Sequence, residues 1–328
     1  MITPLKKRER GIALILVMCI VALIVAITLE LNRASRLQVY EAANIRDGVT
    51  LQYVAKSGVY IGRSALKEDD ASVDSFLDDW AKAQELSLQS ESLFDSGFFE
   101  LKISDESGKI PVNKLTVENN FNDSIREIFI RLLTLPDFGL SEEAANDIVD
   151  AIKDWIDSDD EITGFGAENN WYRGLDVPYA CKNAPLDCVD ELLMVKGITR
   201  GLLYGVEGRM GIAPYLSVFG TGKININTTP LPVLRALSGE ITDEMAADMD
   251  AYRRSEDNKS ELSNSSWYKN ITGMTDINID PDVLSIQSSV FEIQSTGRRG
   301  NMMRTITAIV ERGESAGTMP VISMWKVN

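Results

Sequence analysis

The chain has 328 residues, enough for two ordinary domains or for one domain with a large insertion. Hydrophobic residues make up 44% and charged residues 25%, the balance of a folded protein. The net charge of −16 argues against general nucleic-acid binding, because so acidic a surface repels a phosphate backbone. The sequence contains no histidine, which removes the commonest general base and transition-metal ligand and leaves carboxylate chemistry, hard-cation binding or no catalysis.

The amino-terminal segment predicts a membrane helix. A basic patch over residues 6–11 runs directly into an apolar stretch over residues 12–29, with no charge until Glu30. At 1.5 Å per residue this stretch is about long enough to cross a bilayer. The cations before it favour a cytoplasmic amino end, with the bulk of the chain outside the inner membrane. A cleaved secretory signal is the alternative, but no small-residue cleavage site follows the apolar stretch.

The helical pattern continues beyond the membrane segment. Apolar or small residues recur at spacings of three and four, which predicts one stripe packed on a globular body; they are Leu51, Val54, Ala55, Gly58, Ile61 and Ala65. No proline interrupts residues 12–66, so a helix over residues 12–68 would be about 80 Å long. Gly48 and Gly58 are the positions where we expect it to bend.

The leader resembles that of type IV pilin-like proteins, because a short basic stretch ending in Gly11 meets the apolar helix without a spacer. The resemblance implies cleavage by a prepilin peptidase between Gly11 and Ile12, which leaves the apolar helix on residues 12–68 of the mature chain. Most of these proteins carry glutamate at the fifth mature position, where this chain has Leu16. That exception is expected of one member, the large minor pseudopilin K of type II secretion systems, which needs no subunit above it.

Alternating apolar and polar residues predict strands near residues 99–104, 291–294, 306–310 and 321–327. One strand precedes a helix-rich middle, and two or three strands follow it. This order indicates a single sheet interrupted by a large insertion. The expected class is therefore α+β: a pilin-like long helix packed on an antiparallel sheet, with a large all-α insertion. The expected parts are a leader at 1–11, the long helix at 12–68, pilin-like segments at 69–112 and 218–328, and the insertion at 113–217.

The middle of the chain repeats itself weakly. The run from Gly108 to Asn113 is echoed from Gly222 to Asn227, and each is followed by an apolar helix and then by a Ser141 or Thr242 helix cap. These units resemble helix–hairpin–helix or SAM-like modules. A DNA-binding role around Gly197 is one interpretation, because such hairpins grip phosphate with backbone amides. Protein packing is the interpretation that the acidity of the chain favours.

The resemblance to pseudopilin K extends over most of the chain. It rests on residues 154–160, 166–168, 172, 191–199, 214–218 and 224–228 together with the leader. It implies a single-pass inner-membrane protein with a periplasmic body, placed at the tip of a short pseudopilus that supports export across the outer membrane. The implied partners are the minor pseudopilins I and J, other pseudopilins, the inner-membrane secretion platform, the prepilin peptidase and membrane lipid, with no nucleic acid.

One acidic constellation is a candidate metal site. Acids at alternate loop positions can turn several oxygens inward, as calcium requires, although this spacing is not that of an EF-hand. From the residues alone, a solvated acidic loop is the simpler interpretation. The resemblance to pseudopilin K reverses this, and it implies structural calcium on Asp157, Asp159, Asp160 and Glu168. A hydrolase with paired carboxylates is the enzymatic alternative, and nothing else in the sequence supports it.

The three cysteines divide into two groups. Cys19 lies in the membrane segment, where it is a small apolar residue. Cys181 and Cys188 lie in a loop that the expected orientation places in the oxidising periplasm, so we expect a disulfide between them. With two cysteines and no histidine, zinc is disfavoured.

The sequence thus predicts a non-enzymatic minor pseudopilin. Two rival functions stay open: a membrane-anchored helix–hairpin–helix protein that binds DNA in competence, and a minor pilin of a type IV pilus. The first would need a basic face on the hairpin units, where Lys196, Arg200 and Arg209 are few against the nearby acids. The second would share the leader but lack the stretches that resemble pseudopilin K.

Overall fold

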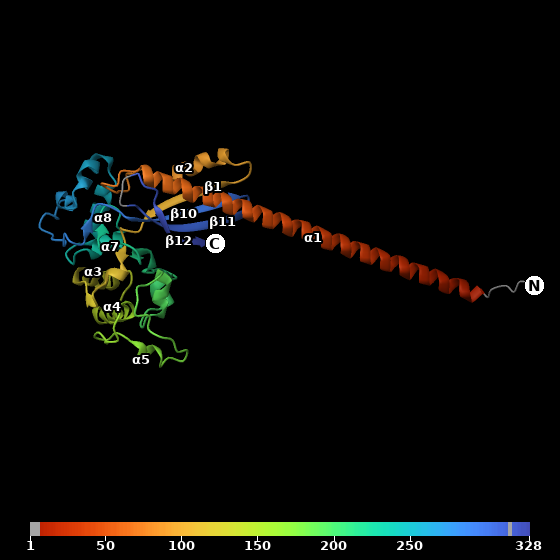
Figure 1. The fold of residues 1–328 in the computed structure, drawn as a ribbon, viewed down its shortest axis with the longest axis horizontal. Helices are drawn as coiled ribbons and strands as arrows, with labels where there is room; N and C mark the ends of the chain where they lie inside the picture. Colours follow the sequence, from red (N-terminus) through yellow and green to blue (C-terminus); the bar gives the residue numbers. More distant parts are fainter. Residues whose placement is uncertain (1–6, 314–316) are drawn as a thin grey trace, which may run out of the picture.

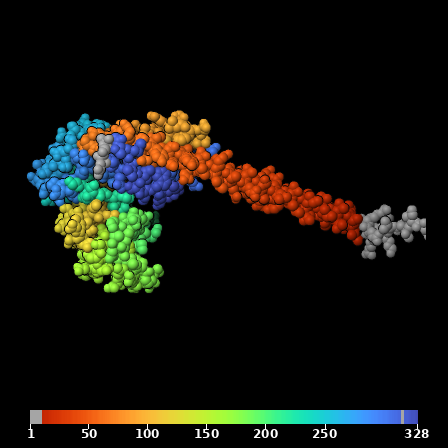
Figure 2. All heavy atoms as spheres, viewed as in Figure 1, coloured from red at the N-terminus to blue at the C-terminus, as the bar shows by residue number. Residues whose placement is uncertain are grey.

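The computed structural model describes residues 7–313 and 317–328, so the first six residues of the expected leader lie outside the described part. Figure 1 shows a long helix, α1 (Lys7–Glu68), with one end packed on a four-stranded sheet and the other end projecting far from it. A body of short helices lies beside the sheet. In the space-filling view this body forms a second arm at an angle to α1 (Figure 2).

Helix α1 continues without a break through Gly48 and Gly58, the two positions at which the sequence allows a bend. Its second half packs on the sheet, and Leu51, Val54 and Ala55 of the predicted stripe are buried. Gly58 is a contact point rather than a weak point: a β-carbon there would lie 2.2 Å from Ser295 Oγ and 3.0 Å from the Phe99 ring. The glycine therefore lets the helix approach the sheet closely.

The sheet has the order β1-β10-β11-β12, and every pairing is antiparallel. Its strands are β1 (Phe98–Asp105), β10 (Val290–Arg299), β11 (Met302–Glu311) and β12 (Val321–Val327). All four predicted strands are thus confirmed, and β1 and β12 are the edges. Phe99, Leu101 and Ile103 are buried in the core shared with α1, while Glu100 and Lys102 alternate with them on the exposed side.

The helical body occupies the chain between β1 and β10. Its longer helices are α3 (Asp123–Thr134), α4 (Glu142–Ile156) and α8 (Asp243–Arg253). Its shorter helices are α5 (Asn169–Tyr172), α6 (Arg200–Tyr204), α7 (Leu231–Ala236) and the 3₁₀ turns η2 (Val112–Lys114), η3 (Val189–Met194), η4 (Ala213–Tyr215), η5 (Glu256–Ser263) and η6 (Trp267–Asn270). Two-residue strands complete it: β2 (Ile110–Pro111), β3 (Thr116–Val117), β4 (Asn120–Phe121), β5 (Gly205–Val206), β6 (Arg209–Met210), β7 (Leu216–Ser217), β8 (Ile224–Asn225) and β9 (Leu284–Ser285). Ahead of β1, α2 (Gln84–Gln89) and η1 (Ser90–Leu93) pack on the sheet edge.

The weak internal repeat corresponds to two similar units. In the first, β2 leads through α3 and α4 to β7, which pairs with β2 in parallel. In the second, β8 leads through α7 and α8 to β9, with the same parallel pairing. Ser141 and Thr242 cap α4 and α8, each accepting a bond from the amide three residues on. The two units meet where α3 packs on α7.

The helical body extends further along the chain than the expected 113–217. Its hydrophobic core contains residues from Ile110 to Leu284, with Leu77 from the segment ahead of β1, and the chain returns to the sheet only at β10. The reason is the second parallel pairing, Ile224 with Leu284, which ties residues 218–285 to the helices. Residues 106–289 thus form the insertion, and the second pilin-like segment is shorter than expected.

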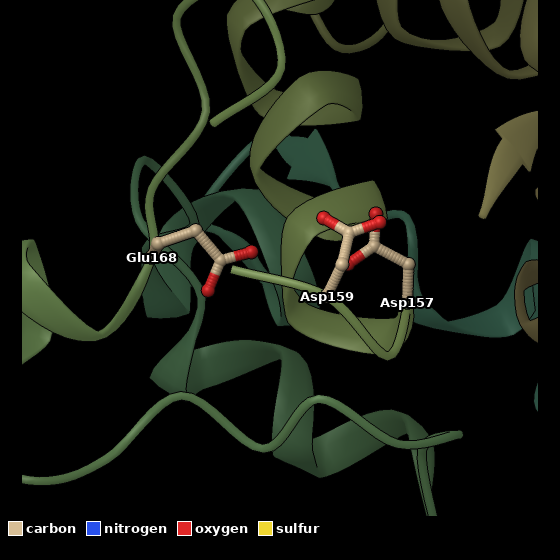
Figure 3. Close-up of side chains that lie close together, drawn as sticks. All are labelled: Asp157, Asp159 and Glu168. Carbon is tan, nitrogen blue, oxygen red and sulfur yellow. The ribbon is translucent and has the colours of Figure 1, made fainter. Parts of the chain in front are cut away.

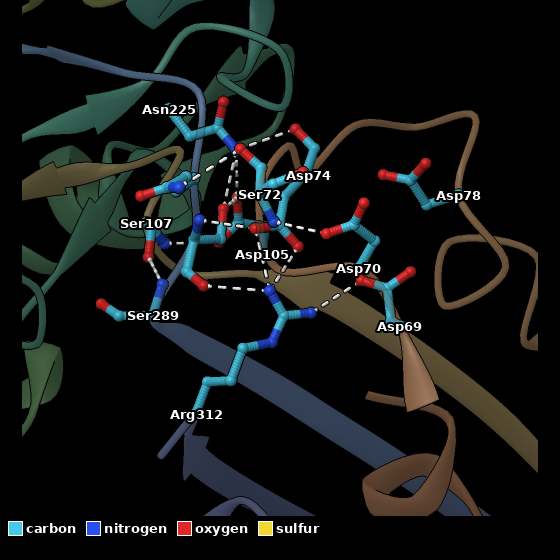
Figure 4. A network of polar contacts seen from close by, with 12 residues as sticks. Asp69, Asp70, Ser72, Asp74, Asp78, Asp105, Ser107, Asn225, Ser289 and Arg312 are labelled. Atoms are coloured by element: carbon cyan, nitrogen blue, oxygen red, sulfur yellow. Dashed lines mark hydrogen bonds and ion pairs between the residues drawn. The ribbon is translucent and has the colours of Figure 1, made fainter. Parts of the chain in front are cut away.

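A buried polar network joins the helical body to the sheet (Figure 4). Arg312, just after β11, donates to both carboxylate oxygens of Asp74, at 2.7 and 2.9 Å, and to Asp69 at 2.8 Å. Asp74 also accepts from the amide of Ser288 at 2.7 Å. Burial raises the pKa of Asp74 to about 7, against the lowering effect of Arg312.

Asp105, at the end of β1, is the second centre of this network. It accepts from the hydroxyls of Ser288 and Thr228, from the amide of Ser107 at 2.7 Å and from the amide group of Asn225. All four donors lie in the insertion between β1 and β10, whereas Asp105 itself is the last residue of β1. The network therefore fixes how the two parts are joined.

Candidate metal centre

The loop after α4 folds back over one acidic face of that helix. The amide of Phe165 donates to Asp150 at 3.2 Å, and the amide of Thr163 donates to Asp154 at 3.1 Å. Glycines make this approach possible: a β-carbon on Gly164 would lie 2.1 Å from an Asp150 oxygen, and one on Gly166 would lie 2.0 Å from an Asp154 oxygen. The loop thus presents its own acids close to those of the helix.

Three of the four predicted ligands come together in this loop (Figure 3). Asp157, Asp159 and Glu168 each offer a carboxylate oxygen, and these oxygens lie within 4.8 Å of one another. Asp157 follows the last residue of α4, and Glu168 precedes the first residue of α5. The ends of two helices therefore position the cluster.

Burial leaves several of these oxygens without a donor. Asp157 and Glu168 are each 2% exposed. Asp157 Oδ2 accepts from Lys153, but Asp157 Oδ1 and both carboxylate oxygens of Glu168 have no hydrogen-bond partner in the described residues. An unpaired buried carboxylate is costly, and a bound cation would remove that cost. The residues therefore fit a metal ion, and an all-oxygen set of irregular geometry suits calcium.

The electrostatics of the cluster agree with this fit. Burial raises the pKa of Glu168 to about 7, and the neighbouring Asp154 and Asp157 raise it as well. The pKa of Asp157 is raised by burial, against the lowering effect of Lys153. Asp154 was not among the predicted ligands. Its position three residues before Asp157, which directly follows α4, was the available signal, because this short spacing brings both acids to the same end of the helix.

The structure does not bring Asp160 into the cluster. Its Oδ1 accepts from the side-chain amides of Asn169 at 2.9 Å and Asn183 at 3.2 Å. Asp160 is not among the acids whose oxygens lie within 4.8 Å of one another. Asn183 also donates to the carbonyl of Asp159, while its own buried Oδ1 has no partner in the described part of the chain.

Cys181 and Cys188 are free thiols in this structure, so the predicted disulfide is not formed in it. Cys181 is buried and donates to the carbonyl of Asp154 at 3.4 Å, whereas Cys188 is exposed. Burial, with the nearby Glu168 carboxylate, raises the pKa of Cys181 to about 12. The bridge stays a prediction, which a count of free thiols in the exported protein tests.

The segment around Gly197, for which phosphate binding is one interpretation of the sequence, leads into a short helix. Gly197 lies between η3 and α6 with φ of +86°, but α6 has only five residues. Lys196 beside it donates to the carbonyls of Phe165 at 2.7 Å and Gly166 at 3.1 Å. This lysine therefore holds the acidic loop in place rather than facing a nucleic acid.

The chain is similar in sequence to proteins of type II secretion systems. Residues 108–210 match the family model described as type II secretion system (T2SS), protein K. A type II secretion system protein K from Aeromonas hydrophila is 24% identical over 336 residues, covering 95% of each chain. One from Pseudomonas aeruginosa is 27% identical over 245 residues, covering 71% of this chain and 69% of the relative.

A solved structure shares the fold. It is the GspK-GspI-GspJ complex from the type 2 secretion system of enterotoxigenic Escherichia coli, in which one chain matches with a TM-score of 0.66 at 17% identity. The match covers 88% of this chain and 99% of the other. A long apolar helix packed on an antiparallel sheet, with a helical insertion, defines a pilin-like protein. In sequence, the chain is similar to type II secretion system protein K.

Proposed function

We propose that this protein is the minor pseudopilin at the tip of the periplasmic pseudopilus of a type II secretion machine, where it supports export across the outer membrane. The main observation is that a large helical body is inserted into the sheet, and that this sheet packs on one end of an exposed apolar helix. A body of this size beside the sheet would obstruct a further subunit stacked above it. Leu16 in place of the usual glutamate is consistent with a subunit that has none above.

The exposed half of α1 supports a membrane location. This helix is long and apolar enough to cross a bilayer, and its apolar window is entirely unburied in the fold. We infer a single-pass inner-membrane protein with a cytoplasmic amino end and a periplasmic body. Membrane lipid and the secretion platform are then its partners in the bilayer, and apolar helix contacts hold it beside other pseudopilins.

The leader predicts how the chain is processed. Gly11 and Ile12 lie on exposed helix, and a prepilin peptidase that cuts between them would leave Ile12 as the first residue. We expect the intact mass of the membrane-extracted protein to correspond to residues 12–328. Replacing Gly11 with valine should leave the leader attached, since the added side chain obstructs the cut. A mature chain that starts beyond Leu29 would contradict the retained anchor.

Assembly with the minor pseudopilins I and J is the direct test of the function. We expect the full chain, extracted in detergent, to co-purify with both when the three are expressed together. The matched control is Gly11→Val, in which the leader stays attached. If neither pseudopilin I nor J co-purifies with the processed chain, the proposed place at the tip is wrong. A gel shift at low salt separates the competence alternative, for which we expect no DNA binding.

We further propose that Asp157, Asp159 and Glu168 hold a structural calcium ion. The ion would offset repulsion among these carboxylates and supply the partners that three of their oxygens lack. It would fix the loop over residues 157–168 onto α4. On this proposal the protein is not an enzyme: its physical work is association with other subunits.

A further inference from the structure

A groove runs along β1 and over Gln294 and Thr296 of the neighbouring strand β10, apart from the acidic loop. Its volume is about 740 Å³, and six consecutive strand residues, Glu100 to Asp105, line it. The segment carrying Phe76 and Trp80 forms one wall, and the helical body with Arg254 forms the other. A strand edge at the floor of a groove offers backbone groups as well as side chains.

The chain covers only half of this edge itself. Ser90 Oγ bonds both the amide and the carbonyl of Phe99, at 3.2 and 3.0 Å, and Ser87 Oγ accepts from the amide of Leu101 at 2.8 Å. Both serines belong to α2 and η1, which close off the start of β1. These bonds also establish that the odd-numbered residues of β1 direct their amides and carbonyls outward.

The second half of the edge is open. By the two-residue alternation of a strand, Ile103 directs its amide and carbonyl outward in the same way as Leu101. No described residue bonds the outward amide or carbonyl of Ile103. The chain therefore leaves a donor and an acceptor at the floor of the groove, in the arrangement that an added strand requires.

The lining favours a negatively charged partner. Four of its charged residues are basic and three acidic, in a chain whose net charge is −16. Lys102 is exposed and takes part in no ion pair among the described residues, whereas Glu100 is held by Arg298 at 2.7 Å. Arg254, about half exposed, stacks on the Phe76 ring at 4.2 Å and pairs with Asp250 at 2.8 Å. Lys102 is therefore the unpaired positive charge that faces the groove in the described part of the chain.

One wall also carries an unsatisfied donor. Trp80 is 1% exposed, lines the groove, and its indole Nε1 has no hydrogen-bond partner in the described part of the chain. The Trp80 ring packs edge-on against Phe291, with ring centroids 5.1 Å apart, so it belongs to the sheet core beneath the groove.

We propose that the open half of β1 takes up an extended, acidic peptide segment of another protein as an added strand in this groove. Backbone bonds to Ile103 supply affinity, and Lys102 selects carboxylate side chains. The site does not depend on pseudopilin assembly, because all of its groups belong to this chain alone. Its failure would leave the tip assignment untouched.

Fluorescence anisotropy with labelled peptides tests the site on the full chain in detergent. The probes are a peptide of alternating glutamate and valine, its lysine–valine counterpart, and the glutamate peptide with methyl groups on alternate backbone nitrogens. We expect the unmethylated acidic peptide to bind at least roughly tenfold more tightly than the other two. Equal binding of the methylated peptide, or no binding of the acidic one, overturns the proposal.

Matched charge reversals locate the peptide. Lys102→Glu, on the exposed side of β1, should lower the affinity for the acidic peptide by roughly tenfold or more. Lys326→Glu, on the opposite edge strand β12, should leave its affinity unchanged. If the β12 variant weakens binding and the β1 variant does not, the peptide lies on the wrong edge and the proposal fails.

Discussion

Removing calcium should lower the melting temperature of the protein by several degrees, and restoring it should reverse the change. Extracellular calcium sites have dissociation constants of about 10⁻⁴ to 10⁻³ M. At an ion concentration about 10 to 100 times higher, binding stabilises the fold by about 1.4 to 2.7 kcal/mol. For a protein of this size that corresponds to roughly 3 to 10 °C. Thermal unfolding in chelator and in excess calcium measures it.

Two variants separate a metal site from a general effect of ions. Glu168→Gln should abolish the calcium response, because it removes a buried ligand charge. Asp160→Asn should retain the response, because the amides of Asn169 and Asn183, not the cluster, hold that carboxylate. An unchanged melting temperature for the unmodified protein, or a response lost only with Asp160→Asn, would mean that the cluster binds no calcium.

Without calcium, the Glu168→Gln substitution should stabilise the protein. The folded state raises the pKa of Glu168 to about 7, so it holds a proton more tightly than the unfolded state does. The stability gained from that proton is present at low pH and is lost as the pH rises through about 7. In chelator at pH 8 we therefore expect Glu168→Gln to be more stable than the unmodified protein, and the difference to shrink at pH 5.

Replacing Arg312 with alanine should destabilise the protein by about 3 to 5 kcal/mol, the usual cost of leaving buried charges unpaired. Arg312 is the one cation that pairs with both Asp69 and Asp74 in the described part of the chain, and Asp74 is fully buried. The loss should be larger at pH 8 than at pH 5, because a protonated Asp74 no longer needs the arginine. Chemical denaturation at both pH values measures it.

A second substitution distinguishes a lost ion pair from lost packing. We expect the double variant Arg312→Met, Asp74→Asn to be more stable than Arg312→Met alone, since the second substitution removes the charge that the arginine neutralised. Arg299→Ala is the matched control: its pair with Asp47 at 3.1 Å is partly exposed, so we expect a change of about 0 to 1 kcal/mol. If Arg312→Ala behaves like Arg299→Ala, the network does not hold the junction.

The sequence predicted the sheet because its strands are half buried. Phe291 and Ile293 alternate with Glu292 and Gln294, and this period is visible without any structure. The extent of the helical body was not readable in the same way. It depends on the pairing of Ile224 with Leu284, two short segments about 60 residues apart that carry no periodic pattern of their own.

The acidic cluster was predicted in part. Asp157, Asp159 and Glu168 come together as expected, but the amides that draw Asp160 away belong to Asn169 and Asn183, whose approach depends on how the loops fold. The groove beside β1 was not predicted, since it arises where a strand edge meets a separate helical body. Strand patterns indicate which face is buried, but they do not indicate which edge is left open.

The insertion begins and ends at neighbouring points of the sheet. Asp105 and Phe291 are register partners, and the amide of Glu106 bonds the carbonyl of Val290 at 3.0 Å. A two-residue turn could join β1 directly to β10 as an ordinary hairpin, without disturbing the helix or the other strands. The helical body therefore leaves and rejoins the scaffold at a single hairpin position, so the order of the strands around it is that of an uninterrupted sheet.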